Sequence, residues 1–356
     1  MRDVVVVVGA GVVGAACAYY LRRAGLTVTV VDRGGVAGGT TGAGEGNILV
    51  SDKEPGPELD LAIRSNGLWR ELGDELGDVE LEAKGGLVVA ATEAEWQALQ
   101  AFAATQGLVA EPVTPTDFEP HLASGLAGAM FYPQDLQVQP MLAAAKLLQG
   151  VPLRLGVTVH ALEPGRVVTD QGTLYADAVV NAAGVWAGAL GGVPVLPRRG
   201  FILVTTRVAE LVRHKVYAAS YVSNVGSGDA GLQTSAVVEG TRAGSVLIGS
   251  SRERVGFDES MSLPVLRALA RNAIAFFPAL ANVPVIRAYK GFRPYTPDHL
   301  PIIGADPRVP GLFHACGHEG AGVGLAPITG QIIANLITGT PSDVDVHPFR
   351  VERFVA

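Results

Sequence analysis

The sequence predicts a two-domain protein of mixed α/β and α+β class, in which a Rossmann-like dinucleotide-binding domain carries a second domain built on an antiparallel sheet. Three observations support this prediction. A chain of 356 residues is long enough for about two domains. Residues 4–32 have the pattern of a strand, a glycine turn, a helix and a second strand. From residue 199 to about 284 the pattern changes to strands separated by turns, which favours an antiparallel sheet that covers a pocket.

The N-terminal segment is typical of one complete βαβ unit. Five valines at residues 4–8 indicate a buried parallel strand, and the motif GAGVVG follows at residues 9–14. Its glycines permit a tight turn, a close approach to a pyrophosphate and the packing of a helix on the sheet. The second strand ends at Asp32, whose carboxylate can accept hydrogen bonds from ribose hydroxyls. We therefore expect a dinucleotide to bind here.

Composition favours small-molecule chemistry. The net charge of −7 argues against a nucleic acid partner, and the hydrophobic content of 48% with 17% charged residues indicates well-buried cores. Cys17 and Cys316 are the two cysteines, too few for a disulfide framework and without the spacing of a metal or iron–sulfur site. This usage predicts a reducing, cytoplasmic location. No signal peptide is expected, and no apolar run reaches the roughly 18 residues of a membrane span.

Periodicity and turn residues place the remaining elements. Helical spacing predicts helices over residues 58–76, 93–106, 140–148, 265–277 and 326–338. Apolar runs predict strands over residues 85–91, 153–160, 166–169, 173–175 and 177–186. The five prolines between residues 112 and 140 predict a connecting region with little regular structure. The expected domains are discontinuous: residues 1–80, 140–200 and 285–356 form the cofactor domain, and residues 81–139 and 201–284 form the substrate domain.

Two further glycine-rich segments suggest which dinucleotide binds. The loop at residues 34–44 is too rich in glycine for a helix or strand and is expected either to lie against a flat or phosphate-like group or to be disordered. A second turn at residues 317–324 precedes a helix, so its N–H groups and the helix dipole can stabilise a heteroaromatic ring that gains negative charge. A reduced flavin needs such a neighbour, whereas a nicotinamide enzyme has no obvious use for this turn.

These motifs resemble the FAD-dependent amino-acid and amine oxidoreductases, which include D-amino-acid oxidase, glycine oxidase and sarcosine oxidase. The resemblance spans essentially the whole chain. It rests on residues 9–14 with Asp32, 181–186 (NAAGVW), 199–200 (RG), 292–298 (FRPYTPD) with 301–304 (PIIG), and 317–324. It implies an FAD-binding domain of glutathione-reductase type. Residues 249–258 and 317–322 are most similar to the flavin subunits of proline, hydroxyproline, opine and cyanide-forming glycine dehydrogenases, which implies electron transfer to a partner subunit rather than efficient transfer to oxygen.

The resemblance also implies the cofactor contacts. In the first half of the chain these are Gly9, Gly11, Val12, Val13, Gly14, Asp32, Arg33, Thr40, Thr41, Ala43, Gly44, Gly46, Asn47 and Val159. In the second half they are Ala182, Ala183, Gly184, Trp186, Arg293, Gly317, His318, Glu319, Gly320, Ala321, Gly322, Val323 and Gly324. Sarcosine oxidases attach flavin through a cysteine just before a Tyr-Thr pair. Arg293-Pro294 precede that pair here, so FAD is expected to be non-covalent.

Four residues are candidates for the active site. By resemblance, Arg293 would bind the carboxylate of an amino- or imino-acid substrate, because a guanidinium matches a carboxylate bidentately; a structural salt bridge is the alternative. His318 would assist deprotonation of the substrate ammonium or simply hydrogen-bond within its turn. Tyr217 and Tyr221 would close the pocket or merely pack in the core.

Three neighbouring residues are not expected to be catalytic. Glu319 would steer a cationic substrate or cap the following helix. Cys316 is expected to behave as a small buried hydrophobe, and Lys290 as a surface lysine.

The reaction expected from these residues is hydride transfer from the substrate Cα–H to flavin N5, which gives an imine. Three alternatives remain open. They are an oxygen-using amino-acid or sarcosine oxidase that releases peroxide, a non-catalytic flavin-binding subunit, and a nicotinamide dehydrogenase.

Overall fold

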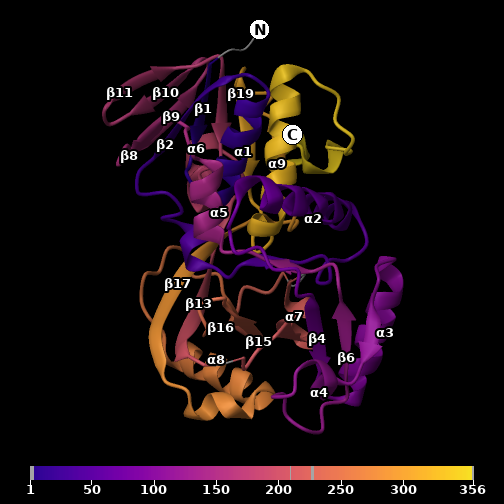
Figure 1. Ribbon diagram of the computed structural model, residues 1–356. Coiled ribbons are helices and arrows are strands. Elements are labelled where there is room, and N and C mark those ends of the chain that lie inside the picture. The colour runs from indigo at the N-terminus through magenta and orange to yellow at the C-terminus, as the bar shows by residue number, and fades with distance from the viewer. Residues whose placement is uncertain (1–3, 209, 226–227, 355–356) are drawn as a thin grey trace.

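A six-stranded sheet forms the centre of the upper domain in Figure 1, with the strand order β18-β19-β12-β1-β2-β8. The computed structural model describes residues 4–208, 210–225 and 228–354. β1 (Val4–Val8) pairs in parallel with β2 (Thr27–Asp32) and β12 (Ala178–Asn181). Since β1 is central, its valines after the first are all buried, as the continuous apolar run predicts. The outer strands are β8 (Leu153–Leu155), β19 (Leu312–Cys316) and β18 (Ile302–Ala305), and β18 runs antiparallel to β19.

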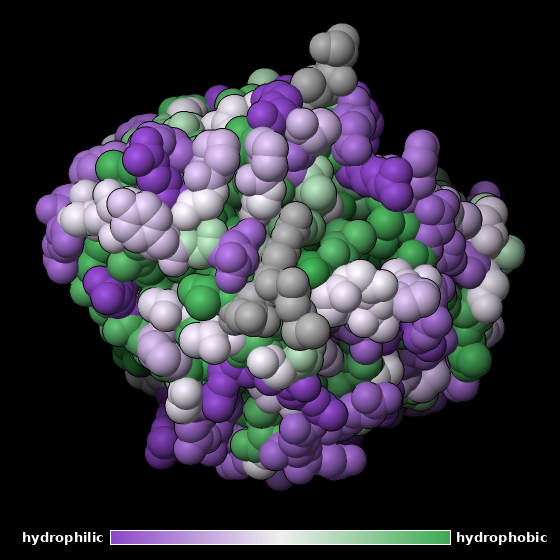
Figure 2. All heavy atoms as spheres, turned by 90° about the horizontal axis from the view of Figure 1, so that it is seen from above, coloured by the Kyte–Doolittle hydropathy of each residue, from purple (hydrophilic) through white to green (hydrophobic). Residues whose placement is uncertain are grey.

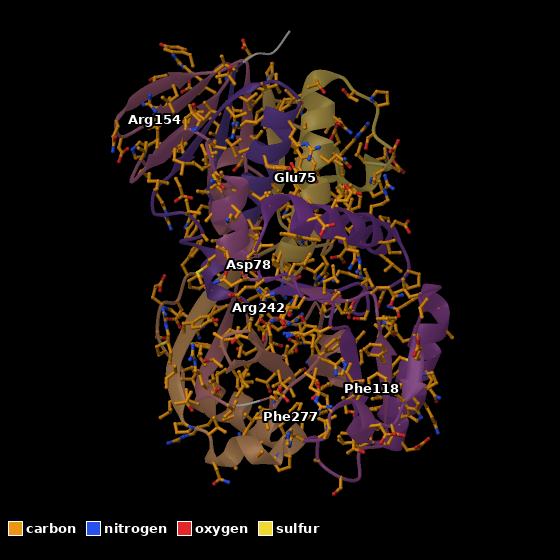
Figure 3. All side chains as sticks on the ribbon, in the orientation of Figure 1. Glu75, Asp78, Phe118, Arg154, Arg242 and Phe277 are labelled. Carbon is orange, nitrogen blue, oxygen red and sulfur yellow. The ribbon has the colours of Figure 1, made fainter. Side chains whose placement is uncertain are left out.

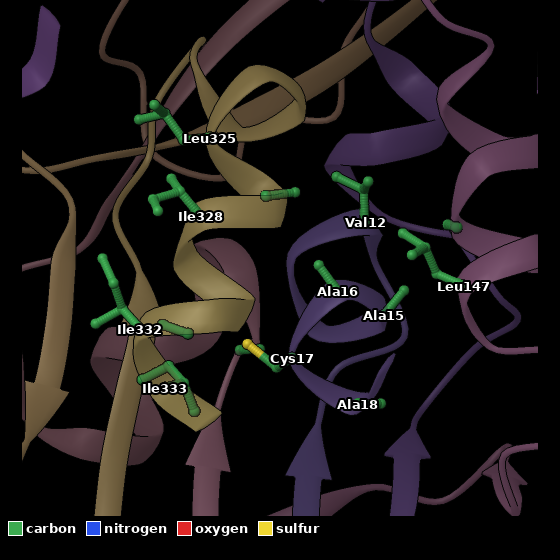
Figure 4. Close-up of a cluster of buried hydrophobic side chains, with 14 of the residues drawn as sticks. Val12, Ala15, Ala16, Cys17, Ala18, Leu147, Leu325, Ile328, Ile332 and Ile333 are labelled. Atoms are coloured by element: carbon green, nitrogen blue, oxygen red, sulfur yellow. The ribbon is translucent and has the colours of Figure 1, made fainter. Parts of the chain in front are cut away.

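Two helices that begin at the glycine turns pack against each other. These are α1 (Val12–Arg23) and α9 (Gly322–Thr338), and Figure 4 shows the two helices side by side, with the small side chains of α1 and the isoleucines of α9 in one buried cluster. A Cβ on Gly330 would lie 2.6 Å from backbone atoms of Ala16, so glycine is needed at this crossing. The sequence predicts this second helix over residues 326–338, but the helix begins four residues earlier, at Gly322.

The other elements of this domain pack on both faces of the six-stranded sheet. α2 (Pro57–Leu76) and α5 (Pro140–Leu147) lie beside the helix pair, and the three-stranded sheet of β9 (Val159–Glu163), β10 (Arg166–Thr169) and β11 (Gly172–Tyr175) lies on the opposite face. α2 is hydrogen-bonded to the start of α9. The Trp69 indole N–H of α2 donates to the carbonyl oxygens of Val323 and Gly324. The remaining elements are α6 (Ala187–Gly191) and the two-stranded antiparallel sheet of β3 (Asn47–Ile48) and β7 (Leu136–Gln137). Short 3₁₀ helices cover Thr40–Ala43, Gly184–Trp186, His347–Phe349 and Val351–Phe354, and a further one, Pro278–Asn282, lies in the lower domain.

The lower domain is built on an eight-stranded sheet with the order β17-β13-β16-β15-β14-β4-β6-β5. β14 and β4 run parallel, and the other neighbours are antiparallel. The strands are β4 (Gly86–Ala90), β5 (Glu111–Val113), β6 (Gly128–Tyr132), β13 (Leu196–Arg207), β14 (Lys215–Ala218), β15 (Gln233–Gly240), β16 (Ser245–Arg252) and β17 (Val285–Tyr295). The helices are α3 (Glu93–Gln106), α4 (Pro115–Phe118), α7 (Ala219–Val225) and α8 (Leu263–Phe276).

Helices close the lower domain on two sides. α8 lies across the bottom of the sheet in Figure 1 and buries Val265, Leu269 and Ala273, which recur every four residues. α3 begins with a capping box formed by Thr92 and Glu95, and it packs beside β4 and β6.

The prediction of a largely irregular segment between residues 112 and 140 is wrong. β5 and β6 lie in the eight-stranded sheet, and α4 connects them. Pro112 is compatible with β5 because this strand is at the edge of the sheet, where a missing N–H costs little. The large sheet also contains β17 and the first residues of β13, whereas the predicted boundaries assign residues 196–200 and 285–295 to the cofactor domain.

An exposed ion pair lies at the boundary between the two domains. Arg242, in the turn between β15 and β16, pairs with Asp78 at 2.7 Å, and Figure 3 shows both residues at the boundary between the upper and lower parts.

Seen from above, the upper domain has hydrophilic side chains interspersed with smaller apolar areas (Figure 2). In the part of the chain that the structure describes, no helix has the length and apolar character to cross a membrane.

Candidate cofactor and active site

One cavity of about 390 Å³ runs between the two domains and is lined by both glycine turns. It therefore brings together segments that lie about 300 residues apart in the sequence. The predicted residues that line it are Gly9, Gly11, Val12, Val13, Gly14, Asp32, Arg33, Thr40, Thr41, Ala43, Gly44, Asn47, Val159, Ala182, Ala183, Gly184, Trp186, Tyr221, Arg293, His318, Glu319, Gly320, Gly322 and Val323. Gly46, Gly317, Ala321 and Gly324 are not among the lining residues, although Ala321 and Gly324 line a small adjoining hollow.

The first glycine turn is built for close backbone approach. Gly9 has a φ of +116°, and a Cβ there would collide with the Ala182 carbonyl oxygen. A Cβ on Gly14 would collide with the Gly9 carbonyl oxygen in the same way. The Thr41 hydroxyl accepts a hydrogen bond from the Val12 N–H at 3.0 Å. This bond holds the 3₁₀ helix Thr40–Ala43 beside the start of α1. The turn thus forms a narrow cradle at a helix N-terminus, which suits a pyrophosphate.

Asp32 lies at the rim of the same cradle. Its carboxylate accepts hydrogen bonds from the N–H groups of Ala10 and Gly34, both at 2.7 Å. Nearby, the Arg33 guanidinium lies 3.6 Å from the centroid of the Trp186 ring, and Trp186 stacks on Phe257. A carboxylate and a cation–π pair at the cavity wall fit the ribose and adenine portions of a dinucleotide.

The second glycine turn places two titratable residues at the other end of the cavity. His318 is buried, and its Nε2 lies 2.9 Å from the Thr329 hydroxyl on α9. Burial lowers the pKa of His318 to about 3, so the imidazole is neutral near pH 7. Glu319 pairs with Arg198 at 2.6 Å and with His299 at 3.1 Å. Burial opposes ionisation of Glu319, but the His299 hydrogen bond and the charges of Arg252 and Arg198 lower its pKa to about 2.

Arg293 reaches the cavity from β17. Its Nη1 donates to the Ser251 carbonyl oxygen at 2.8 Å, and a Cβ on Gly200 would collide with that nitrogen. Among the described residues no carboxylate pairs with Arg293, whereas Arg199 pairs with Glu253 and Asp258. Burial lowers the pKa of Arg293, so an anion bound beside it would stabilise the charged form.

The two predicted tyrosines occupy different environments. Tyr221 lines the cavity, with its ring edge against Tyr217 and the Arg252 guanidinium 5.0 Å from its centroid. Tyr217 does not line the cavity. Its hydroxyl contacts Ser51, which in turn donates to Asp135, and burial raises the pKa of Asp135 to about 7. Tyr217 therefore belongs to a buried polar network behind the cavity wall.

Cys316 and Lys290 flank these candidates in the sequence, and the structure shows the surroundings of both. Cys316 is buried at the cavity wall, and burial raises the pKa of its thiol to about 12. It therefore remains a thiol at neutral pH, as a small buried hydrophobe would. Lys290 pairs with Glu259 at 2.6 Å.

Sequence reasoning missed several lining residues, of which Glu45 is the most notable. The others that bear on the active site are Gly200, Ile202, Gly291, Phe292 and Pro294. Glu45 is the single charged residue between positions 34 and 51, and it stands between two glycines. That isolated charge was a usable signal. Gly200, Phe292 and Pro294 stand in the motifs RG and FRPYTPD but were not predicted as lining residues. The contacts of Ile202 and Gly291 depend on pairing in the large sheet and leave no comparable local pattern.

Comparison with known proteins identifies the family. Residues 4–336 match the model of a family described as FAD dependent oxidoreductase. The chain belongs to this family. It is 30% identical to the hydrogen cyanide synthase subunit HcnC of Pseudomonas aeruginosa, over 98% of this chain and 96% of that protein. Its structure is similar to the crystal structure of glycine oxidase from Geobacillus kaustophilus, with a TM-score of 0.89, 28% identity and 99% of each chain covered. L-proline dehydrogenase from P. horikoshii has the same fold, with a TM-score of 0.87, 23% identity and coverage of 99% and 98%.

Family membership confirms the predicted fold class, the FAD cofactor and the oxidoreductase assignment. The Asp32 carboxylate, the cradle at Gly9 and Gly14 and the second glycine turn would hold the ribose, the pyrophosphate and the flavin ring of FAD, in the order in which these groups are joined. Because FAD explains both glycine turns, it replaces the nicotinamide alternative.

Proposed function

We propose that this oxidoreductase removes two electrons from the C–N bond of an amino or imino acid. The expected substrates resemble proline or hydroxyproline, or else glycine or sarcosine, and the product is an imine. FAD, when bound, supplies the hydride acceptor at N5. The protein's own residues then have to bind the carboxylate, orient the Cα–H bond and provide a place for the ammonium proton.

The observation that carries this proposal is the guanidinium of Arg293. It lines the cavity and donates to one backbone carbonyl, and no acid neutralises it in the described residues. Leaving a cation unpaired in a partly buried site is costly unless a bound anion completes it. A substrate carboxylate in a bidentate pair would supply that anion and fix the α-carbon beside the second glycine turn.

The relatives support an amino-acid substrate. Glycine oxidase and L-proline dehydrogenase are named for oxidations at a carbon next to an amine. HcnC is named as a subunit of hydrogen cyanide synthase, and by analogy we propose that the electrons of this protein pass to a partner rather than efficiently to oxygen. An oxidase that releases peroxide, and a flavin-binding subunit without activity, are the alternatives to be separated by experiment.

An anaerobic screen of flavin bleaching tests the proposal. Both enantiomers of proline, hydroxyproline and the common amino acids, together with glycine and sarcosine, would be added to the FAD-loaded protein. Arg293→Ala should retain FAD and require about 10–100-fold more substrate, because a charge-assisted bidentate interaction is lost. Arg287→Ala is the matched control, since Arg287 lies on the same strand but is exposed. Unchanged substrate affinity in Arg293→Ala would contradict the role of Arg293.

The electron acceptor is tested with the substrate that the screen identifies. We expect fast turnover with an artificial dye and slow peroxide release in air with substrate alone. Rapid stoichiometric peroxide formation would instead favour the oxidase. Absence of bleaching by every amino acid would favour the non-catalytic subunit.

A further inference from the structure

Glu45 is a buried carboxylate that projects between the FAD cradle and the large sheet. It follows the 3₁₀ helix Thr40–Ala43, and its side chain is 6% exposed. A Cβ on Gly249 would lie 2.9 Å from Glu45 Oε1 and 3.2 Å from Ile202 Cδ1, so the carboxylate lies against β13 and β16. Glu45 and Ile202 both line the cavity.

The oxygen Oε1 of Glu45 accepts no hydrogen bond in the described part of the chain. The other oxygen accepts one from the Asn47 side-chain amide at 3.3 Å. The nearest cation, Lys215, is 3.7 Å from Oε1 and is already paired with Glu239 at 2.9 Å. A buried carboxylate oxygen without a donor is expensive unless a ligand supplies one, so this oxygen marks a position for a bound donor.

The large sheet relates the contacts of Glu45 to those of Arg293. The Arg293 guanidinium lies against Gly200, and the Glu45 carboxylate lies at Gly249, beside Ile202, which is two residues further along β13. Two residues of a strand span roughly 7 Å. In an α-amino acid the amine nitrogen and the carboxylate oxygens are about 3 Å apart. With a hydrogen bond of about 2.8 Å at each end, such a molecule bridges up to about 9 Å, which covers this separation.

We propose that Glu45 binds the amine end of the substrate and takes one proton from its ammonium nitrogen. This inference rests on the proposed function. The proton moves from nitrogen to Glu45 Oε1, and the freed lone pair forms the C=N bond as the Cα–H bond breaks. The hydride leaves to the flavin, so two electrons pass from the substrate to the cofactor.

The surroundings of Glu45 suit this task better than those of His318. The groups that face it are Lys215, Glu239, Arg293, Asn47 and Tyr289. Burial raises the pKa of Glu45, with the charges of Lys215 and Arg293 opposing the effect. A carboxylate with a raised pKa holds a transferred proton more readily. His318, by contrast, is hydrogen-bonded to Thr329, and its lowered pKa makes it a weak base.

Binding measurements test the recognition step. Each amino acid that bleaches the flavin is compared with a probe that has oxygen in place of nitrogen: tetrahydrofuran-2-carboxylate for proline, methoxyacetate for sarcosine and glycolate for glycine. In Glu45→Gln the amino-acid concentration for half-maximal anaerobic flavin reduction should rise about 10–100-fold, while the inhibition constant of the unreactive oxygen probe should stay nearly unchanged. Arg293→Ala should weaken both. Glu253→Gln is the control, because it makes the same change in an ion pair outside the cavity.

The pH dependence of anaerobic flavin reduction tests the proton transfer. With saturating substrate, wild-type reduction should vary little between pH 7 and 9. In Glu45→Gln the rate should rise about tenfold per pH unit, because only substrate that has already lost its proton reacts. Glu45→Asp keeps the charge and should show an intermediate loss of affinity, which also serves if Glu45→Gln fails to fold.

Equal weakening of the amino acid and the oxygen probe, or a wild-type pH profile in Glu45→Gln, would overturn the role of Glu45 while the proposed function stands. If no amino acid reduces the wild-type flavin, the proposed function fails and this inference fails with it.

Discussion

Replacing Glu319 with glutamine is expected to lower the free energy of unfolding by about 3 kcal/mol near neutral pH. The side chain is 7% exposed and pairs with Arg198, which is fully buried, and with His299. Burial opposes ionisation, but the hydrogen bond from His299 and the charges of Arg252 and Arg198 outweigh it and lower the pKa from the ordinary value of 4.5 to about 2. A tenfold change in proton affinity is worth about 1.4 kcal/mol, so the interactions of the ionised form stabilise the fold by about 3 kcal/mol. Breaking a buried ion pair from one side has a similar cost of about 3–5 kcal/mol.

The sign of the pH effect follows from the lowered pKa of Glu319. The stabilisation is fully present above pH 4.5, because the carboxylate is then ionised in both the folded and unfolded states. It falls by about 0.8 kcal/mol at pH 4 and about 2 kcal/mol at pH 3, and it is lost as the pH drops through about 2. The glutamine variant lacks this component. The difference between wild type and variant should therefore shrink as the solution is acidified.

Urea unfolding followed by circular dichroism at pH 7 and pH 4 would measure this difference. Glu163→Gln is the matched control: Glu163 also pairs with an arginine, Arg166, but its side chain is 38% exposed. Its loss should stay within about 1 kcal/mol at both pH values. A loss below about 1 kcal/mol in Glu319→Gln at pH 7, or a difference from wild type that grows toward pH 4, would refute the reasoning.

Three further outcomes are expected. Gly14→Ala should lose most bound FAD, measured as the ratio of flavin to protein, because the new Cβ collides with the Gly9 carbonyl; Gly67→Ala, with no atom within 4 Å of its Cβ, should keep FAD and gain up to about 1 kcal/mol. FAD is expected to be non-covalent, so acid precipitation should release all of it into the supernatant, and yellow protein in the pellet would contradict this. Phe277→Ala should lower the free energy of unfolding by about 3–5 kcal/mol in urea titrations, because Phe277 is fully buried beneath the large sheet (Figure 3).

Local patterns made the cofactor domain predictable from the sequence. The valine run of β1, the turn at residues 9–14 and Asp32 lie within 30 residues of each other, so one continuous segment contains the whole signal. The second glycine turn was recognisable for the same reason. Helix boundaries were predicted closely where periodicity and capping agree, as in α3 with its Thr92–Glu95 capping box.

Long-range pairing explains what the sequence could not predict. β5 and β6 were missed because five prolines obscure their pattern, and their place was decided by pairing with β4 at the edge of the sheet. Tyr217 and Tyr221 are four residues apart, yet only Tyr221 lines the cavity. The difference arises because β14 ends between them and α7 begins, a change of direction that depends on packing.

The charges on the large sheet indicate why one arginine rather than another is open to a substrate. Arg198, Arg199 and Arg293 lie on the paired strands β13 and β17, and Arg198 is directly opposite Arg293 in the register. Arg198 is neutralised by Glu319, and Arg199 by Glu253 and Asp258. Each of these two cations is therefore fixed by the protein itself. Arg293 is left to be completed by an anion, and the open oxygen of Glu45 lies at Gly249, beside Ile202, which is two residues of β13, roughly 7 Å of strand, from Gly200. A cation without a carboxylate partner and a carboxylate oxygen without a hydrogen-bond donor favour a zwitterion over a simple carboxylate, because a carboxylate alone would leave Glu45 Oε1 without a donor.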